Sequence, residues 1–125
     1  MTDRLRIVLV EDDVLIAMDL ADLLIGMGHE VSAIARTEAE AQAAAAKFQP
    51  DLMIVDGNLE EGSGVSAMRE ILAHGFVPHF YVTGDPLQVD GLASDAIIVA
   101  KPFNLRTLTN GIAQARQIRD APACL

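Results

Sequence analysis

Short runs of consecutive apolar residues alternate along this chain with longer stretches in which apolar residues have helical spacing. The apolar runs lack polar interruptions, which is typical of strands buried on both faces of a sheet. Four such runs predict strands at residues 7–10, 52–55, 80–82 and 96–100. A fifth segment, residues 30–35, is less apolar and fits a strand at the edge of the sheet.

The stretches between these runs predict four helices, at about residues 16–27, 37–48, 65–72 and 105–115. Gly28 follows the first helix at the position where a left-handed backbone favours glycine. Thr37 and Glu40 have the spacing of a capping box that opens the second helix. Asn104 is a suitable cap for the last helix.

The resulting order of strands and helices indicates an α/β fold with a parallel sheet and helices on both faces. Residues 84–95 interrupt this order, because they contain Gly84, Pro86 and Gly91 and only a few apolar positions. A full amphipathic helix is not expected there. We predict a fourth helix that is short or disordered.

Polar residues stand directly after four of the predicted strands: Glu11-Asp12-Asp13, Asp56, Thr83 and Lys101-Pro102. The carboxyl ends of parallel strands meet at one edge of a sheet, and ligands bind at that edge in open α/β folds. Taken singly, each residue has an ordinary explanation: an aspartate that caps a helix or a turn, or a lysine on the surface. Their common position beyond buried strands favours a shared site.

The expected site crowds carboxylates around a single ammonium group. Two like charges about 4 Å apart repel by roughly 4 kcal/mol at an effective dielectric constant near 20. Lys101 cannot offset several carboxylates, so the pattern predicts a bound divalent cation. Oxygen ligands that leave room for water and phosphate oxygens suit Mg²⁺.

Charge and composition narrow the function classes further. The net charge of −9 argues against nucleic-acid binding, which depends on lysine and arginine. No apolar run is long enough to cross a bilayer, and no apolar signal segment precedes the first strand. The single cysteine, Cys124, has no partner for an internal disulfide. We therefore expect a cytoplasmic protein with no membrane association.

The strand-end residues resemble those of the receiver domains of two-component response regulators, and the likeness extends over about residues 5–119. The resemblance implies a flavodoxin-like, doubly wound sheet of five parallel strands in the order 2-1-3-4-5. It also implies that Asp56 accepts a phosphoryl group from a histidine kinase or a phosphotransfer protein. Thr83 would bind a phosphoryl oxygen and Lys101 would pair with its charge.

In the same family pattern, Mg²⁺ would be held by Asp12, Asp13, Asp56 and the backbone carbonyl of Asn58. The family further implies a cis peptide bond before Pro102, which aims the lysine into the site. Such a domain is a phosphoacceptor in signalling and not an enzyme, although it can assist its own phosphorylation and dephosphorylation.

Two features depart from the usual receiver pattern. Ile98 stands where most receivers have an aromatic residue that moves together with the threonine, whereas Tyr81 and Phe103 are expected in the core. The segment from Pro78 to Gly84 partly matches a subgroup of stand-alone receivers with a Phe-Ala-Thr-Gly string and a shortened fourth helix. In receivers, the position of Asp85 influences the lifetime of the phosphoryl group.

The sequence predicts one receiver domain over residues 1–125 with no output domain. Such a chain would signal by protein–protein contact with a downstream partner, or serve as a phosphate sink for a kinase. A magnesium-dependent phosphohydrolase of the haloacid dehalogenase type would need an acid at Asn58, where an asparagine cannot transfer protons. A flavin-binding protein would not place Glu11, Asp12 and Asp13 beside its phosphate.

Overall fold

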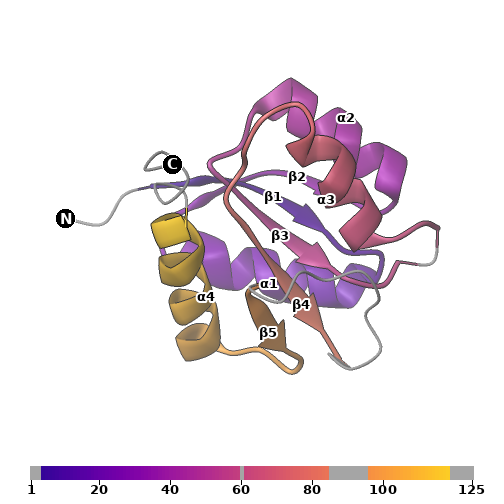
Figure 1. The fold of residues 1–125 in the computed structure, drawn as a ribbon. Helices are drawn as coiled ribbons and strands as arrows, with labels where there is room; N and C mark the ends of the chain where they lie inside the picture. Colours follow the sequence, from indigo (N-terminus) through magenta and orange to yellow (C-terminus); the bar gives the residue numbers. More distant parts are fainter. Residues whose placement is uncertain (1–3, 60, 85–95, 119–125) are drawn as a thin grey trace.

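Residues 4–59, 61–84 and 96–118 are described by the computed structural model, in which a central sheet lies between two layers of helices (Figure 1). The elements follow one another in this order: β1 (Arg6–Val10), α1 (Val14–Gly26), β2 (Glu30–Ala35), α2 (Glu38–Phe48), β3 (Leu52–Asp56), α3 (Gly64–Leu72), β4 (His79–Thr83), β5 (Ile98–Ala100) and α4 (Leu105–Ile118).

All strands in the described part of the chain pair in parallel, in the order β2-β1-β3-β4-β5. The predicted doubly wound sheet and its 2-1-3-4-5 order are therefore confirmed. The edge position predicted for residues 30–35 is also confirmed, because β2 pairs only with β1 among the described residues.

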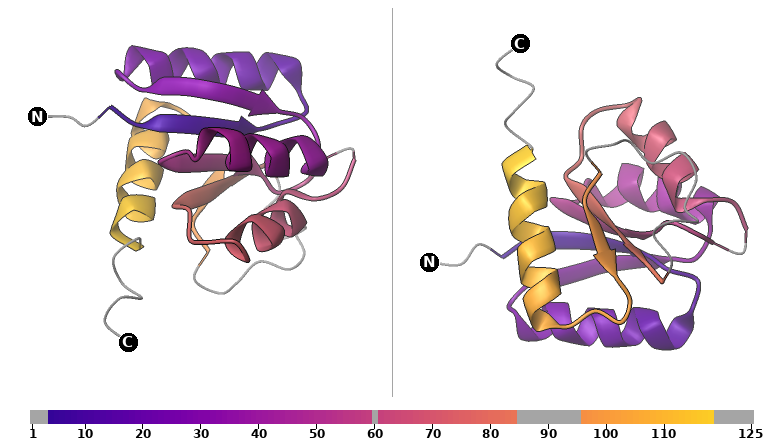
Figure 2. Two further views of the ribbon diagram at one scale, coloured as in Figure 1. Left: turned by 90° about the horizontal axis from the view of Figure 1, so that it is seen from above. Right: turned by 60° about the horizontal axis from the view of Figure 1, so that its bottom comes forward.

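Two apolar cores form because alternate residues of each strand point to opposite faces. Leu9 and Ile54 lie in the core beneath α1 and α4, whereas Val10 and Val55 lie in the core beneath α2 and α3. Both views in Figure 2 agree with this division of the helices between the two faces. Because β1 and β3 are buried on both sides, their sequences read as unbroken apolar runs.

The predicted helix ends appear in the structure as hydrogen-bonded caps. Thr37 Oγ1 accepts the backbone N–H of Glu40 at 3.1 Å, as expected for the first residue of a capping box. Asn104 Oδ1 accepts the N–H of Thr107 at 3.0 Å, ahead of α4. Gly28 has a φ of 96° just beyond α1, which is a backbone conformation that favours glycine.

Two predictions concern residues outside the described ranges. The short or disordered helix in residues 84–95 lies almost wholly outside the described residues, since 85–95 are not among them. Cys124 lies outside them as well. In the ranges that are described, no helix combines the length and the apolar character needed to cross a membrane.

Gly64 packs so closely against β3 that it leaves no room for a side chain. A Cβ atom at this position would lie 1.9 Å from the backbone carbonyl oxygen of Asp56. We expect Gly64→Ala to lower the free energy of unfolding by about 3 kcal/mol, because the backbone must shift to relieve the overlap. Denaturant unfolding followed by circular dichroism measures this change.

Gly26 provides the matched control, because a Cβ atom at this helical glycine would meet nothing within 4 Å. Gly26→Ala should be neutral or stabilise the fold by up to about 1 kcal/mol, since alanine favours the helix. Equal effects of the two substitutions would contradict the packing argument.

Candidate functional site

The polar residues of the predicted site come together because the backbones of neighbouring strand ends are hydrogen-bonded to one another. The N–H of Gly57 donates to the carbonyl of Val82 at 3.4 Å, which links the ends of β3 and β4. The N–H of Lys101 donates to the carbonyl of Thr83 at 2.9 Å, which links β5 to β4. The carboxyl edge of the sheet therefore fixes the positions from which these side chains extend.

Lys101 reaches from the end of β5 to two carboxylates. Its Nζ lies 2.8 Å from Glu11 Oε1 and 3.1 Å from Asp56 Oδ2. The Glu11 side chain is only 4% exposed and that of Asp56 9%, so this ion pair is largely shielded from water. Such shielding makes the pairing stronger than at an open surface, because solvent screens it less.

Three carboxylates meet at this position. One carboxylate oxygen from each of Glu11, Asp12 and Asp56 lies within 4.8 Å of the other two. A single ammonium group cannot neutralise three carboxylates, and hard oxygen ligands at this spacing fit Mg²⁺. The donor set is therefore suited to the cation that the sequence predicts.

Asp12 lies in this cluster, whereas Asp13, the other aspartate expected to hold the metal, does not. The Oδ1 atom of Asp13 accepts the N–H groups of Leu15 at 3.0 Å and Ile16 at 3.2 Å, so Asp13 is the N-cap of α1. Glu11 takes the second acidic position instead. Sequence reasoning placed Glu11 at the strand end but did not assign it as a metal ligand. Its position directly after β1 was one signal for that role, and an aspartate just before a helix, such as Asp13, commonly caps the helix.

Burial and neighbouring charges shift two pKa values in the site. Burial, together with the adjacent Asp56 carboxylate, raises the pKa of Glu11 from 4.5 to about 7, even though the hydrogen bond from Lys101 opposes this rise. Burial alone would lower the pKa of Lys101, but its hydrogen bond to Glu11 and the negative charges around it have the larger combined effect and raise it. Lys101 is thus held in its charged form.

The backbone after β3 folds back toward the site. The N–H of Asn58 donates to Asp56 Oδ1 at 3.0 Å, and Asn58 forms an isolated antiparallel bridge with Ser63. Asp56 thus has one carboxylate oxygen bonded to Lys101 and the other to a backbone N–H. These two bonds fix the orientation of the carboxylate.

Thr83 is the last residue of β4 and is buried, 2% exposed, beside the end of β3. Ile98 is the first residue of β5 and is 37% exposed. Tyr81 is buried in the core beneath α2 and α3, as predicted, whereas Phe103 is only partly buried and packs against the other core. Neither ring therefore takes the place of the aromatic residue that most receivers have where Ile98 stands.

The peptide bond between Lys101 and Pro102 is cis, as the family resemblance implies. Asp85, the remaining residue singled out from the sequence, lies outside the described residues.

The fold and this site together define a class of α/β proteins with an acidic centre at the carboxyl edge of the sheet. The family model described as response regulator receiver domain matches residues 7–113, and the chain belongs to this family. It is therefore a signalling domain of the kind used in two-component systems.

Proteins called PhyR are among the relatives of this chain. The phyllosphere-induced regulator PhyR of Methylorubrum extorquens is 36% identical over 114 residues, which cover 88% of this chain and 43% of that protein. The receiver domain of Erythrobacter litoralis PhyR superimposes with a TM-score of 0.80 at 34% identity and covers 91% of both chains. The anti-anti-sigma factor PhyR of Bartonella quintana has a TM-score of 0.85 at 30% identity.

The match to the Bartonella quintana protein covers 100% of this chain and 53% of that one. This chain thus spans about half the length of the longer relatives that it matches. The receiver part is what they have in common with it.

The raised pKa of Glu11 makes the stability of the metal-free protein depend on pH. Folded Glu11 keeps its proton up to about pH 7, whereas unfolded Glu11 loses it near 4.5. Its contribution to stability is complete below pH 4.5 and is lost as the pH rises through about 7. We expect the free energy of unfolding of wild type to fall, relative to Glu11→Gln, by about 2–3 kcal/mol across this window.

The measurement is urea unfolding at a series of pH values in the presence of a chelator. The glutamine variant serves as the reference, because it keeps the size of the side chain but cannot lose a proton. Parallel pH profiles for the two proteins would contradict the assigned shift.

Proposed function

We propose that this chain accepts a phosphoryl group on Asp56 with the help of Mg²⁺ and signals through protein–protein contact. The observation that carries the proposal is the placement of Lys101 Nζ at 2.8 Å from Glu11 and 3.1 Å from Asp56, within a cluster of three carboxylates. This arrangement joins a nucleophilic carboxylate, oxygen ligands for a metal and a fixed positive charge at one strand edge.

The donor in this proposal is a phosphohistidine of a kinase or of a phosphotransfer protein. A carboxylate oxygen of Asp56 forms a bond to phosphorus while the bond between phosphorus and the imidazole nitrogen breaks, and the electron pair stays on that nitrogen. Lys101 pairs with negative charge on the transferred group, and the Thr83 hydroxyl donates a hydrogen bond to one of its oxygens.

Glu11, Asp12 and Asp56 would hold the metal through their carboxylates, and Asn58 through its backbone carbonyl. When bound, Mg²⁺ neutralises the crowded carboxylates and the phosphoryl oxygens, which is the main requirement of phosphoryl transfer. Asp13 has a different part in this proposal, since its carboxylate already caps α1. It fixes the helix that begins directly beyond the metal ligands.

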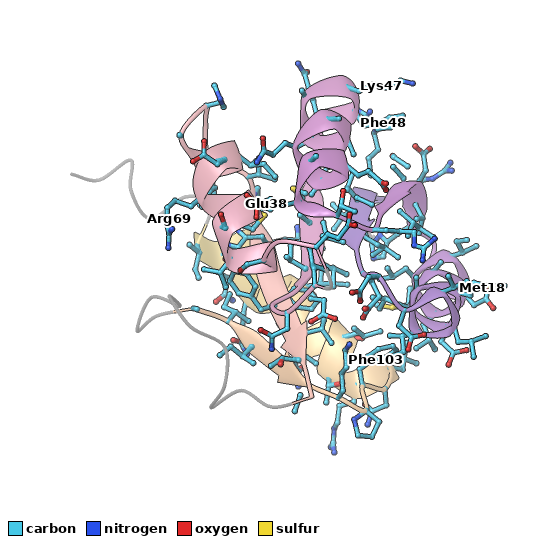
Figure 3. All side chains as sticks on the ribbon, turned by 90° about the vertical axis from the view of Figure 1, so that its right-hand side faces the viewer. Met18, Glu38, Lys47, Phe48, Arg69 and Phe103 are labelled. Carbon is cyan, nitrogen blue, oxygen red and sulfur yellow. The ribbon has the colours of Figure 1, made fainter. Side chains whose placement is uncertain are left out.

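The outer face of α1 supports docking of a phosphodonor protein next to the site. Val14, Leu15, Met18 and Ile25 are 51%, 76%, 56% and 58% exposed, and all lie on this helix. Met18 points away from the rest of the molecule on the outer side of α1 (Figure 3). An apolar helix face that begins beside Asp12 fits a partner that presents a helix and a phosphohistidine together.

The downstream step in this proposal is also a protein contact. The net charge of −9 does not favour nucleic acid as the target. The similar Bartonella quintana protein is described as an anti-anti-sigma factor, which is a role exercised through another protein. The corresponding role for this chain is to present a surface that changes upon phosphorylation of Asp56.

Phosphorylation from a small donor tests the chemistry directly. After incubation with acetyl phosphate and Mg²⁺, the intact mass of wild type should increase by one phosphoryl group. The increase should be absent in Asp56→Ala and after chelation of the metal, and strongly reduced in Asp12→Asn, which weakens metal binding. Asp19→Asn, which removes an exposed carboxylate on α1, should behave like wild type.

Some receivers react only with their kinase, so the same measurement is made with autophosphorylated histidine kinases of the source organism. Wild type and Asp56→Ala that remain equally unmodified with every donor would contradict the proposed function.

If the kinase docks on α1, a substitution on this helix should slow phosphotransfer from the kinase but not phosphorylation by acetyl phosphate. Met18→Glu should slow phosphotransfer from the kinase at least about tenfold, because it places a charge in an apolar interface. It should leave phosphorylation by acetyl phosphate unchanged, since Met18 lies outside the carboxylate cluster. Phe76→Glu is the control, because Phe76 is also exposed, at 46%, but follows α3. Equal slowing by the two variants would contradict docking on α1.

A further inference from the structure

Glu38 is the first residue of α2, but its carboxylate bonds to a different helix. Its Oε1 accepts the backbone N–H of Ser63 at 3.1 Å, and its Oε2 accepts the hydroxyl of Ser66 at 3.0 Å. Its own N–H donates to the carbonyl of Glu61 at 3.4 Å. Three hydrogen bonds therefore join the start of α2 to residues 61–66, and Figure 3 shows Glu38 at the end of α2 that lies beside α3.

These contacts complete the cap of α3 from outside the helix. Ser63 is the N-cap of α3, and its hydroxyl accepts the N–H groups of Val65 and Ser66. In a capping box, the residue three positions after the N-cap is a glutamate or glutamine that accepts the N-cap N–H. Here that position holds Ser66, which is too short for the task, and Glu38 supplies the missing acceptor.

The segment held in this way is the one that follows Asp56. Asn58 bridges to Ser63, and the N–H of Gly64 donates to the carbonyl of Gly57 at 3.3 Å. A fixed Ser63 therefore fixes the backbone around Asn58, whose carbonyl is a proposed metal ligand. Glu38 acts at the far end of the same loop.

The packing around Gly62 shows how closely the carboxylate of Glu38 fits this loop. Gly62 has a φ of 88°, and a Cβ atom added there would lie 2.7 Å from Glu38 Oε1. The turn at this position therefore leaves room for the carboxylate, which is seated against the loop backbone. Among the described residues, Glu38 is not one of the three carboxylates that cluster at the proposed metal site.

We propose that Glu38 is a positioning residue for the metal site, because it anchors the loop that carries Asn58 to the start of α2. This inference rests on the proposed function, since it assumes that the loop contributes to a magnesium site. Residues that hold metal ligands in place typically change metal affinity by 10–100-fold when they are removed.

The test is a titration of each protein with Mg²⁺, followed through the backbone amide signals of Gly57 and Asn58 by nuclear magnetic resonance. Glu38→Ala should raise the dissociation constant for Mg²⁺ about tenfold, because it releases Ser63. Glu38→Gln should stay within about threefold of wild type, since its amide oxygen still accepts the Ser63 N–H. The amide spectrum also establishes that each variant is folded.

Glu40→Ala is the matched control. Glu40 also lies in the first turn of α2, but among the described residues its carboxylate bonds to the N–H of Arg36 and not to residues 61–66. Because Glu40 lines a cavity together with Asp12, its removal also takes one negative charge from the neighbourhood of the metal ligands. It should leave the dissociation constant within about twofold of wild type.

A folded Glu38→Ala protein that binds Mg²⁺ as tightly as wild type would overturn the inference and leave the proposed function intact. Equal weakening by Glu38→Gln and Glu38→Ala would also overturn it, because charge rather than the Ser63 bond would then be responsible. A wild-type protein that does not bind Mg²⁺ would contradict the proposed function and this inference together.

Discussion

The carboxylate cluster under Lys101 is the constraint on which the rest of the site depends. Oxygens of Glu11, Asp12 and Asp56 lie within 4.8 Å of one another, and each pair of like charges at such a distance repels by about 3–4 kcal/mol at an effective dielectric constant near 20. The Lys101 ammonium offsets part of this repulsion, and the proton retained by Glu11 offsets another part. The fold must hold these groups together against the repulsion that remains.

Contacts outside the carboxylate cluster hold these groups together. Strand ends are joined by hydrogen bonds from Gly57 to Val82 and from Lys101 to Thr83. Beyond β3, Gly64 packs directly against the carbonyl of Asp56, and Glu38 holds Ser63 from the neighbouring helix. The described strand ends of the site and the start of α3 are therefore anchored to neighbouring elements.

Local pattern was sufficient to predict most of the fold and the place of the site. Strands buried on both faces leave unbroken apolar runs, and Thr37 and Asn104 reveal helix starts through their own capping chemistry. The strand order came from the family resemblance, because apolar runs alone do not say which strands are neighbours. The role of Glu38 was beyond sequence reasoning, since its partners lie 25 and 28 residues away and only the packing of α2 beside α3 brings them together.

The difference between Asp12 and Asp13 shows why residue type alone is too coarse to assign ligands. The two aspartates are adjacent, yet α1 begins immediately after the second one, so its carboxylate is committed to the free N–H groups of Leu15 and Ile16. Glu11 stands directly beyond β1, where its longer side chain reaches Lys101. The start of α1 thus gives the residues of one acidic run different roles. Glu11 and Asp12 lie in the carboxylate cluster at the sheet edge, and Asp13 caps the helix.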